Sequence, residues 1–195
     1  MCSNEKKLIE KSKKGDVESF EKLIEKYQVI AFNIAYRLIG NVEDAKDVTQ
    51  EALIKVYKFL KNFKGESSFS TWLYKIVMNT CLDMIRKNNK IHTISLDKPI
   101  ENKNGNYNFE LSDNKNVLDE KIEQDEKIKI IQRAIKKLPE KYRVVLVLRD
   151  LQDFSYSDIS DIINCPVGTV KSRINRGRMQ LKEILKEEME LFLEN

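Results

Sequence analysis

The chain has 195 residues, with 35 Lys and Arg against 31 Asp and Glu, and a formal net charge of +4. Six glycines and three prolines are few for an all-β protein with many turns, so the composition favours long helices. His92 is the only histidine, which excludes a metal site built on a histidine pair and acid–base catalysis by two histidines.

Residues 1–90 predict a helical bundle. Between residues 16 and 38, apolar side chains recur at alternating steps of three and four, which predicts one helix with a single buried stripe. A second amphipathic stretch ends before Gly65, and a third begins after Ser68 or Ser70 as its N-cap. The apolar stripe of the second stretch consists of Val42, Ala45, Val48, Ala52, Val56 and Phe59.

Within this block, residues 63–87 combine aromatic and basic side chains. Phe63, Phe69, Trp72 and Tyr74 occur near Lys64, Lys75, Arg86 and Lys87. Aromatic faces beside cations are a means of holding unstacked single-stranded bases. The alternative is a structural role, because a tryptophan such as Trp72 often anchors a core.

An acidic stripe precedes this segment. Asp44, Asp47 and Glu51, with Gln50 alongside, lie opposite the apolar face of their predicted helix. The residues alone leave open whether the stripe is a solvated face or a surface for a protein partner.

The middle of the chain is acidic and has no sustained helical or strand period. Residues 1–90 hold 17 basic and 12 acidic side chains. Residues 91–125 hold 4 basic and 8 acidic side chains, and residues 126–195 hold 14 basic and 11 acidic ones. The middle buries too little apolar surface to offset the entropy of ordering it. The sequence therefore predicts an all-α protein of two small helical domains, residues 1–91 and 122–195, joined by a flexible linker at 92–121.

The C-terminal block predicts a helix-turn-helix. A helix over residues 122–138 ends at Pro139, which can start the next helix, carrying Tyr142, Val145, Leu146 and Leu148. A short helix over residues 157–163, a turn at 164–166 and a long helix from about Val167 follow. Between Asn164 and Lys182 there are five basic side chains and no acidic one, as contacts to phosphates and base edges require. A solvated basic helix in a bundle is the alternative interpretation.

In this order, the segments resemble the extracytoplasmic-function (ECF) sigma factors of bacterial RNA polymerase. The resemblance is carried by VEDAKDVTQEALIKVYKFL, FKGESSFSTWLYKIVMNTCLDMIRK and LPEKYRVVLVLRDLQDFSYSDISDIINCPVGTVKSRINRGR, and it covers about residues 5–88 and 122–188. It implies a dissociable, non-enzymatic subunit without cofactor or metal, which gives the polymerase its promoter specificity.

The resemblance also implies three groups of site residues. The acidic stripe of Asp44, Asp47, Gln50 and Glu51 is expected to dock on the clamp helices of the polymerase largest subunit. Recognition of the −10 element is expected from Phe63, Lys64, Gly65, Glu66, Ser67, Ser68, Phe69, Trp72, Tyr74, Lys75 and Asn79. Recognition of the −35 element is expected from Arg149, Lys171, Ser172, Arg173, Asn175, Arg176 and Arg178. Many relatives carry Arg or a bulkier residue at Lys171 and Asn175, and Lys lacks the fork with which Arg binds guanine.

The implied partners are core RNA polymerase, promoter DNA and a membrane-anchored anti-sigma factor, with the chain itself a monomer. Cys2, Cys81 and Cys165 are widely spaced and form no CxxC pair, which is typical of reduced thiols in the cytoplasm. The longest apolar run, residues 144–148, is far shorter than a membrane span, so no direct membrane insertion is expected.

Two other classes of function are open on the residues alone. A conventional helix-turn-helix regulator would bind a symmetric operator as a dimer and would not associate with core polymerase. A nucleic-acid hydrolase would use scattered carboxylates as metal ligands, for example Asp150, Asp153, Asp158 and Asp161.

Overall fold

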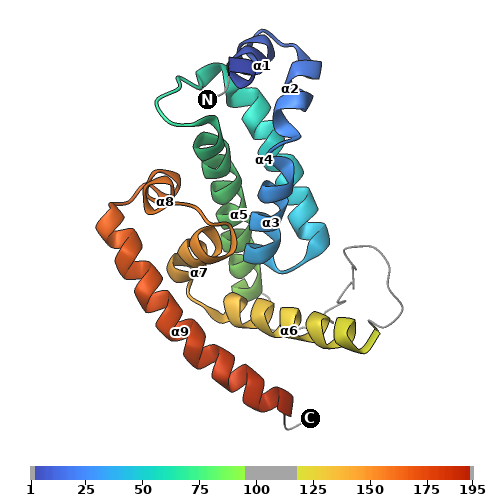
Figure 1. Cartoon of the computed structure of the whole chain (residues 1–195), viewed down its shortest axis with the longest axis vertical. Coiled ribbons are helices and arrows are strands. Elements are labelled where there is room, and N and C mark those ends of the chain that lie inside the picture. The colour runs from blue at the N-terminus through green and yellow to red at the C-terminus, as the bar shows by residue number, and fades with distance from the viewer. Residues whose placement is uncertain (1–2, 95–117, 194–195) are drawn as a thin grey trace.

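The chain is built from helices. The computed structural model describes residues 3–94 and 118–193, and the regular elements in these ranges are all helical, which confirms the predicted fold class. The N-terminal elements are α1 (Ser3–Lys13), α2 (Val17–Ile24), α3 (Gln28–Ile39), α4 (Val42–Phe59), the 3₁₀ turn η1 (Leu60–Asn62) and α5 (Phe69–Ile94). The C-terminal elements are α6 (Leu118–Lys137), α7 (Glu140–Leu146), the π-helical turn η2 (Val147–Leu151), α8 (Tyr156–Ile163) and α9 (Val167–Leu193) (Figure 1).

The prediction of a single helix over residues 16–38 is wrong, because the chain turns between α2 and α3. In this turn the amide of Tyr27 donates to the carbonyl oxygen of Ile24 at 2.8 Å. The Tyr27 hydroxyl donates to Glu5 of α1 at 2.9 Å, and its ring packs edge-on against Phe69 at 5.4 Å. These tertiary contacts hold Tyr27 in the turn, and a count of apolar spacing does not detect them.

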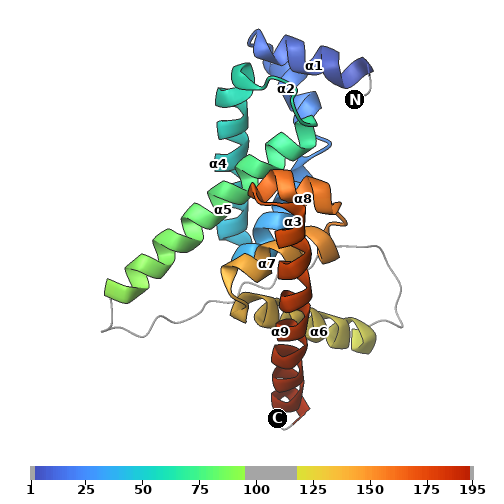
Figure 2. The ribbon, with the colours of Figure 1, turned by 90° about the vertical axis from the view of Figure 1, so that its left-hand side faces the viewer.

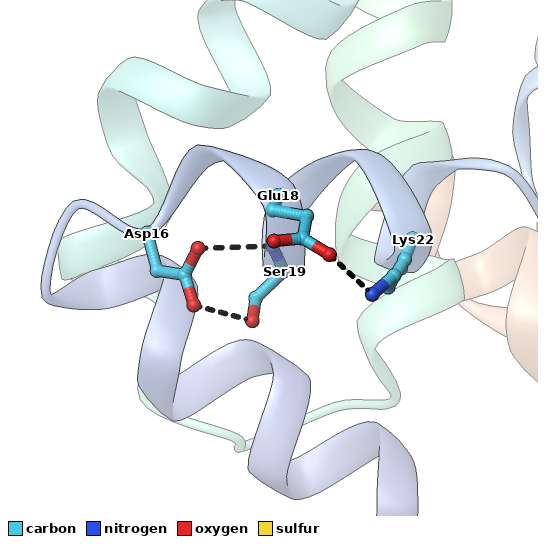
Figure 3. A network of polar contacts seen from close by, with 4 residues as sticks. All are labelled: Asp16, Glu18, Ser19 and Lys22. Carbon is cyan, nitrogen blue, oxygen red and sulfur yellow. Dashed lines mark hydrogen bonds and ion pairs between the residues drawn. The ribbon is translucent and has the colours of Figure 1, made fainter.

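Asp16 starts α2 as its N-cap. Its carboxylate accepts hydrogen bonds from the Ser19 amide at 3.2 Å and the Ser19 hydroxyl at 2.7 Å, while Glu18 pairs with Lys22 at 2.6 Å (Figure 3). The bonds from Ser19 lower the pKa of Asp16, because they stabilise the charged form. The cap thus satisfies two donors near the start of a helix of eight residues.

The core of the N-terminal half lies between α3, α4 and α5. Ile34, Leu38, Val56 and Leu73 are at most 1% exposed, and burying such a side chain contributes about 1.5–3 kcal/mol. Phe59 was predicted in the buried stripe of α4 but is 51% exposed. The backbone tightens into η1 at this point, so the next residue, Leu60, takes the inward position at 1% exposure.

The loop before α5 ends at a serine cap. The Ser68 hydroxyl accepts from the amide of Thr71 at 3.1 Å, so Ser68 rather than Ser70 is the N-cap. Gly65, with φ +80°, allows the loop to turn before it, in a backbone region that favours glycine.

The C-terminal half forms the predicted helix-turn-helix. Ser155 caps α8 by accepting from the amide of Asp158 at 3.1 Å, and Asn164 ends α8 in the left-handed conformation at φ 51°. On α9, Val170 and Ile174 are at most 2% exposed. Gly177 follows on the same side, where an added Cβ would lie 3.2 Å from atoms of α7, so its lack of a side chain permits close helix packing.

The helices extend into the range predicted as a linker. α5 continues to Ile94 and α6 begins at Leu118, so residues 92–94 and 118–121 are helical, and residues 95–117 lie outside the described residues. The acidic C-terminal segment continues α9, where Glu188 is 6% exposed and pairs with Lys137 of α6 at 2.6 Å.

The two halves pack against each other. Their buried apolar residues form one continuous cluster that includes Leu73 of α5 and Ile159 of α8. Figures 1 and 2 show α8 beside the N-terminal half of α5, and α6 crossing near the end of α3. Within the described ranges, no helix is long and apolar enough to cross a membrane.

Candidate nucleic-acid interface

The second helix of the helix-turn-helix presents a basic outer face. Its inner face, with Val170 and Ile174, packs on α7 and α8. The residues exposed on the remaining surface are Lys171, Ser172, Asn175, Arg176 and Arg178, whereas Arg173 is half-buried with a guanidinium nitrogen 4.0 Å from the Cys165 sulfur. The predicted separation of an apolar and a basic face is therefore present, and the exposed donors suit phosphate oxygens and base edges.

Tyr156, the first residue of α8, links two of the predicted DNA contacts. The Arg149 guanidinium lies 5.0 Å from the centre of its ring, and the Lys171 ammonium lies 5.8 Å from it. Arg149 also donates to the carbonyl oxygen of Phe154 at 2.8 Å. These contacts restrict the cations before any ligand arrives, which lowers the entropic cost of using them.

Arg178 is held by a carboxylate of its own chain. Its Nε donates to Asp150 Oδ2 at 3.0 Å, and a terminal nitrogen donates to the other carboxylate oxygen. These hydrogen bonds raise the pKa of Arg178. Arg176, on the same helix, is exposed and lies outside this ion pair.

A polar pocket of about 460 Å³ lies over the loop before α5. Its lining residues are Asn62, Phe63, Lys64, Gly65, Glu66, Ser67, Thr71, Trp72, Lys75, Asp161 and Asn164. The rings of Phe63, Phe69 and Trp72 pack against one another in edge-on and tilted arrangements, with centroids 5.2–5.8 Å apart. Phe63 and Phe69 are at most 5% exposed, so this aromatic cluster supports the loop from its core side. Trp72 is half-buried and lines the pocket together with the amine-bearing Lys64 and Lys75.

The acidic stripe lies on the outer side of α4. Asp47, Gln50 and Glu51 are exposed, and Asp44 is half-buried near the N-terminus of the helix. Glu51 pairs with Lys55 at 2.7 Å, which leaves the N-terminal part of the stripe as its most acidic section. One turn beyond Glu51, Ile54 is 54% exposed, so the acidic surface continues into an apolar one.

Comparison with known proteins identifies the family. Residues 23–91 match Sigma-70 region 2, and residues 128–181 match Sigma-70, region 4. The ECF RNA polymerase sigma factor SigW of Bacillus subtilis is 38% identical over 187 residues, which cover 93% of this chain and 97% of the relative. The chain belongs to the ECF RNA polymerase sigma factor family.

A second relative supports this assignment, and two solved structures share the fold. The ECF RNA polymerase sigma-E factor of Escherichia coli is 38% identical, with 88% of each chain covered. The sigma factor RpoE, solved with the anti-sigma factor NepR from Bartonella quintana, has the same fold with a TM-score of 0.68 at 24% identity, covering 87% of this chain and 98% of that one. CnrH, solved with the cytosolic domain of CnrY, has the same fold with a TM-score of 0.66 at 20% identity, covering 95% of this chain and 99% of that one.

The family regions coincide with these three surfaces. The region 2 match spans the acidic stripe and the loop that forms most of the pocket, and the region 4 match spans the helix-turn-helix, including the pocket residues Asp161 and Asn164. Of the residues expected at the −10 element, the structure brings Phe63, Lys64, Gly65, Glu66, Ser67, Trp72 and Lys75 together around the pocket.

The other four residues expected at the −10 element lie outside the pocket. Ser68 is the α5 cap and Phe69 is fully buried. Tyr74 is 2% exposed, and burial raises the pKa of its hydroxyl. Asn79 is exposed two turns along α5 from Trp72, on the same helical face.

Sequence reasoning missed Tyr156 as a partner of Arg149 and Lys171, and it missed Asp161 and Asn164 as pocket residues. The sequence feature that could have identified Tyr156 is its position as an aromatic residue between two basic segments. It is the first residue of a helix and directly follows Ser155, the N-cap of that helix. No sequence signal places α8 beside the loop, because that proximity depends on how the two halves pack.

Two of the four carboxylates of the hydrolase alternative have structural partners. Asp150 pairs with Arg178, and Asp158 accepts from its own helix cap, Ser155. Within the described residues, no group of three or more His, Cys, Asp and Glu side chains is arranged to hold a metal ion.

Proposed function

We propose that this chain is a non-enzymatic transcription initiation factor that binds core RNA polymerase and directs it to promoters through −10 and −35 elements. The observation that carries the proposal is the joint presence of both Sigma-70 regions in one chain, each with its own polar surface. A helix in the major groove reads duplex DNA, whereas a pocket beside aromatic and basic residues suits an unstacked base.

The −35 element is read by the outer face of α9. Lys171, Ser172, Asn175 and Arg176 contact base edges and phosphates from their exposed positions. Arg149 and Arg173 are more restricted and hold the backbone, and Arg178 supports the turn before α8 through Asp150. This division assigns base reading to the exposed polar and basic side chains of α9.

The −10 element is held in the loop pocket. Lys64 and Lys75 attract the phosphate backbone, while Trp72 offers a partly exposed ring for stacking. Gly65, Glu66 and Ser67 shape the loop around the extruded base. Phe63 and Phe69 support this loop from the core, and Asn79 contacts the strand further along α5.

Core polymerase docks on the acidic stripe of α4. Asp44, Asp47, Gln50 and Glu51 meet a basic face of the clamp helices, and the exposed Ile54 adds apolar contact beside them. We assign the chain to the cytoplasm, where polymerase and promoter DNA are present. In its free state the chain is a monomer.

An anti-sigma factor regulates this chain. Two structural relatives with TM-scores of 0.68 and 0.66 were solved with a bound partner, NepR as an anti-sigma factor and the cytosolic domain of CnrY. A membrane-anchored form of this partner would connect initiation to a signal outside the cell, as the resemblance implies.

Analytical ultracentrifugation with purified core polymerase tests the proposal against the dimeric regulator. The chain alone is expected to sediment as a monomer, and the mixture is expected to contain a one-to-one complex with core polymerase. A stable homodimer that binds a symmetric duplex and leaves core polymerase unbound would contradict the proposal and support the regulator.

A further inference from the structure

The first helix and the turn after it carry a dense group of exposed lysines. Residues 3–14 hold five lysines and two glutamates. Four of these lysines are exposed, and we call them the α1 lysines: Lys6, Lys7, Lys11 and Lys14. The first and the last of them are about 12 Å apart along the chain at about 1.5 Å of rise per residue. Lys7 and Lys11 are one helical turn apart, and like charges at this spacing repel each other, so the group suits a polyanionic ligand.

The acidic residues around these lysines already have partners in the chain. Glu5 accepts a hydrogen bond from the Tyr27 hydroxyl at 2.9 Å, and Glu10 pairs with Lys13 at 3.2 Å. Asp16 accepts two hydrogen bonds as the N-cap of α2. In the part of the chain that the structure describes, no acidic side chain forms an ion pair with an α1 lysine. The charge of the four lysines is therefore available to a ligand.

The helix that bears these lysines lies beside the loop pocket. The Lys13 ammonium is 5.8 Å from the centre of the Phe63 ring, and Phe63 lines the pocket. α1 also packs against η1, in which Lys61 is exposed, and the pocket residue Lys64 follows three positions later. Exposed lysines thus occur in the pocket, on η1 and on the helix packed against η1.

The position of α1 relative to α5 indicates which part of a bound strand would reach it. Figures 1 and 2 show α1 at the loop end of α5, far from the end of α5 at Ile94. In the proposed function, the −35 element is upstream of the pocket, and Asn79 contacts the strand along α5. The upstream part of the strand then follows α5. The part downstream of the −10 element leaves the pocket at the loop end, where α1 lies.

The apolar residues of α1 favour DNA over a membrane surface as the polyanion. A helix that binds a membrane surface places an apolar face among the lipids. Ile9 of α1 is 4% exposed, and Leu8 is half-buried against the same core cluster. The apolar side of α1 is therefore used by the protein core, and the lysines remain on its outward surface.

We propose that the α1 lysines bind the backbone of the opened strand immediately downstream of the −10 element. Lysine ammonium groups contact phosphates and do not distinguish bases, so α1 adds affinity for the opened strand without adding sequence preference. This inference rests on the proposed function, because it extends the path of the strand that the loop pocket holds.

The test uses holoenzyme reconstituted from core polymerase and the full-length chain. The α1 variant carries Lys6→Gln, Lys7→Gln, Lys11→Gln and Lys14→Gln. The control variant loses the same charge from exposed lysines of α6, α7 and α9, through Lys129→Gln, Lys136→Gln, Lys141→Gln and Lys186→Gln. The probes are three fluorescein-labelled single strands from a promoter that the wild-type holoenzyme transcribes. The first spans only the −10 element, and the other two extend it by about six nucleotides, one downstream and one upstream. Anisotropy titrations at several salt concentrations measure the affinity for each strand.

The α1 variant is expected to lose affinity for the downstream-extended strand alone, by at least about tenfold at low salt. Each lysine–phosphate contact to a single strand contributes about −0.7 to the slope of log K against log salt concentration. Loss of four such contacts is expected to make that slope less negative by about 2–3 for the downstream-extended strand. The control variant is expected to match the wild type on all three strands.

Unchanged affinity of the α1 variant for the downstream-extended strand would overturn the proposal, and so would an equal loss on all three strands. Unchanged DNA binding together with loss of cosedimentation with phosphatidylglycerol vesicles, in the α1 variant alone, would assign the lysines to a membrane surface instead. Run-off transcription separates this proposal from the proposed function. Initiation by the wild type without the expected loss in the α1 variant sinks only the role of α1, whereas no initiation from any promoter sinks the proposed function and the role of α1 that rests on it.

Discussion

At the scale of single residues, neighbouring arginines on α9 have different chemical situations. Arg178 forms a two-point ion pair with Asp150, whereas Arg176 is exposed outside that pair. Both lie in a run of basic residues, and the resemblance to ECF sigma factors implies that both contact the −35 element. The run predicts positive charge on the helix, but it does not reveal which cations are held by an acidic residue 28 positions earlier.

Replacing these two arginines one at a time distinguishes recognition of DNA bases from a structural role. Arg176→Ala is expected to weaken binding to a −35 duplex by about 1–3 kcal/mol and to reduce discrimination against a scrambled duplex, because a base-reading donor is lost. Arg178→Ala is expected to change discrimination less, because that guanidinium is bound to Asp150. Anisotropy titrations of both variants on cognate and scrambled duplexes measure the difference, and equal loss of discrimination in both would contradict the assignment.

The cysteines are expected to differ in reactivity because their burial differs. Cys81 is fully buried, and burial raises the pKa of its thiol to about 12, whereas Cys165 is half-buried. A raised pKa keeps the thiol protonated below that value, so Cys81 has almost no reactive thiolate at pH 8. Treatment with iodoacetamide at pH 8, followed by peptide mass spectrometry, is expected to modify Cys165 and to spare Cys81 until the chain is unfolded. Equal labelling of both in the native chain would show that Cys81 is accessible.

At the scale of elements, sequence patterns predicted helices well and their interruptions poorly. Apolar spacing identified the helical regions and the helix-turn-helix, because amphipathic helices repeat every 3.6 residues. It did not predict the turn at Tyr27 or the outward position of Phe59, because both depend on tertiary packing and on the tightening into η1. The pocket loop was predicted from Gly65 and its aromatic neighbours, but the burial of Phe69 and Tyr74 was not.

The cap of α8 is expected to stabilise the helix-turn-helix measurably. Ser155→Ala removes the hydroxyl that accepts from the Asp158 amide, and it is expected to lower the free energy of unfolding by about 1 kcal/mol. Ser157→Ala, on the exposed surface of the same helix, is the matched control and is expected to change it by less than about 0.5 kcal/mol. Urea denaturation followed by circular dichroism measures both, and indistinguishable midpoints would show that the cap contributes little.

At the scale of the whole molecule, the net charge of +4 is the sum of two basic halves and an acidic middle. Such a small total predicts weak general affinity for DNA, which suits a factor that reaches promoters as part of polymerase. The packing of the two halves was not predictable from the sequence, since Gln132 and the carbonyls of α3 lie about 95 positions apart and carry no pattern. That packing places Asp161 and Asn164 in the wall of the pocket, so this part of the candidate site depends on contacts that local sequence patterns do not describe.

The central claim is that the chain gives core polymerase its promoter specificity through the acidic stripe and two DNA surfaces. Run-off transcription tests it directly, with purified core polymerase, fragments of the genome that encodes the chain, and three proteins: wild type, Asp47→Lys on the stripe and Glu18→Lys on α2. Transcripts are expected with the wild type and the Glu18 variant, starting downstream of a shared pair of motifs. The Asp47 variant is expected to bind core polymerase at least about tenfold more weakly, because it reverses a charge on the docking surface. Absence of any chain-dependent transcript, under conditions where a control sigma factor initiates from its own promoter, would contradict the claim.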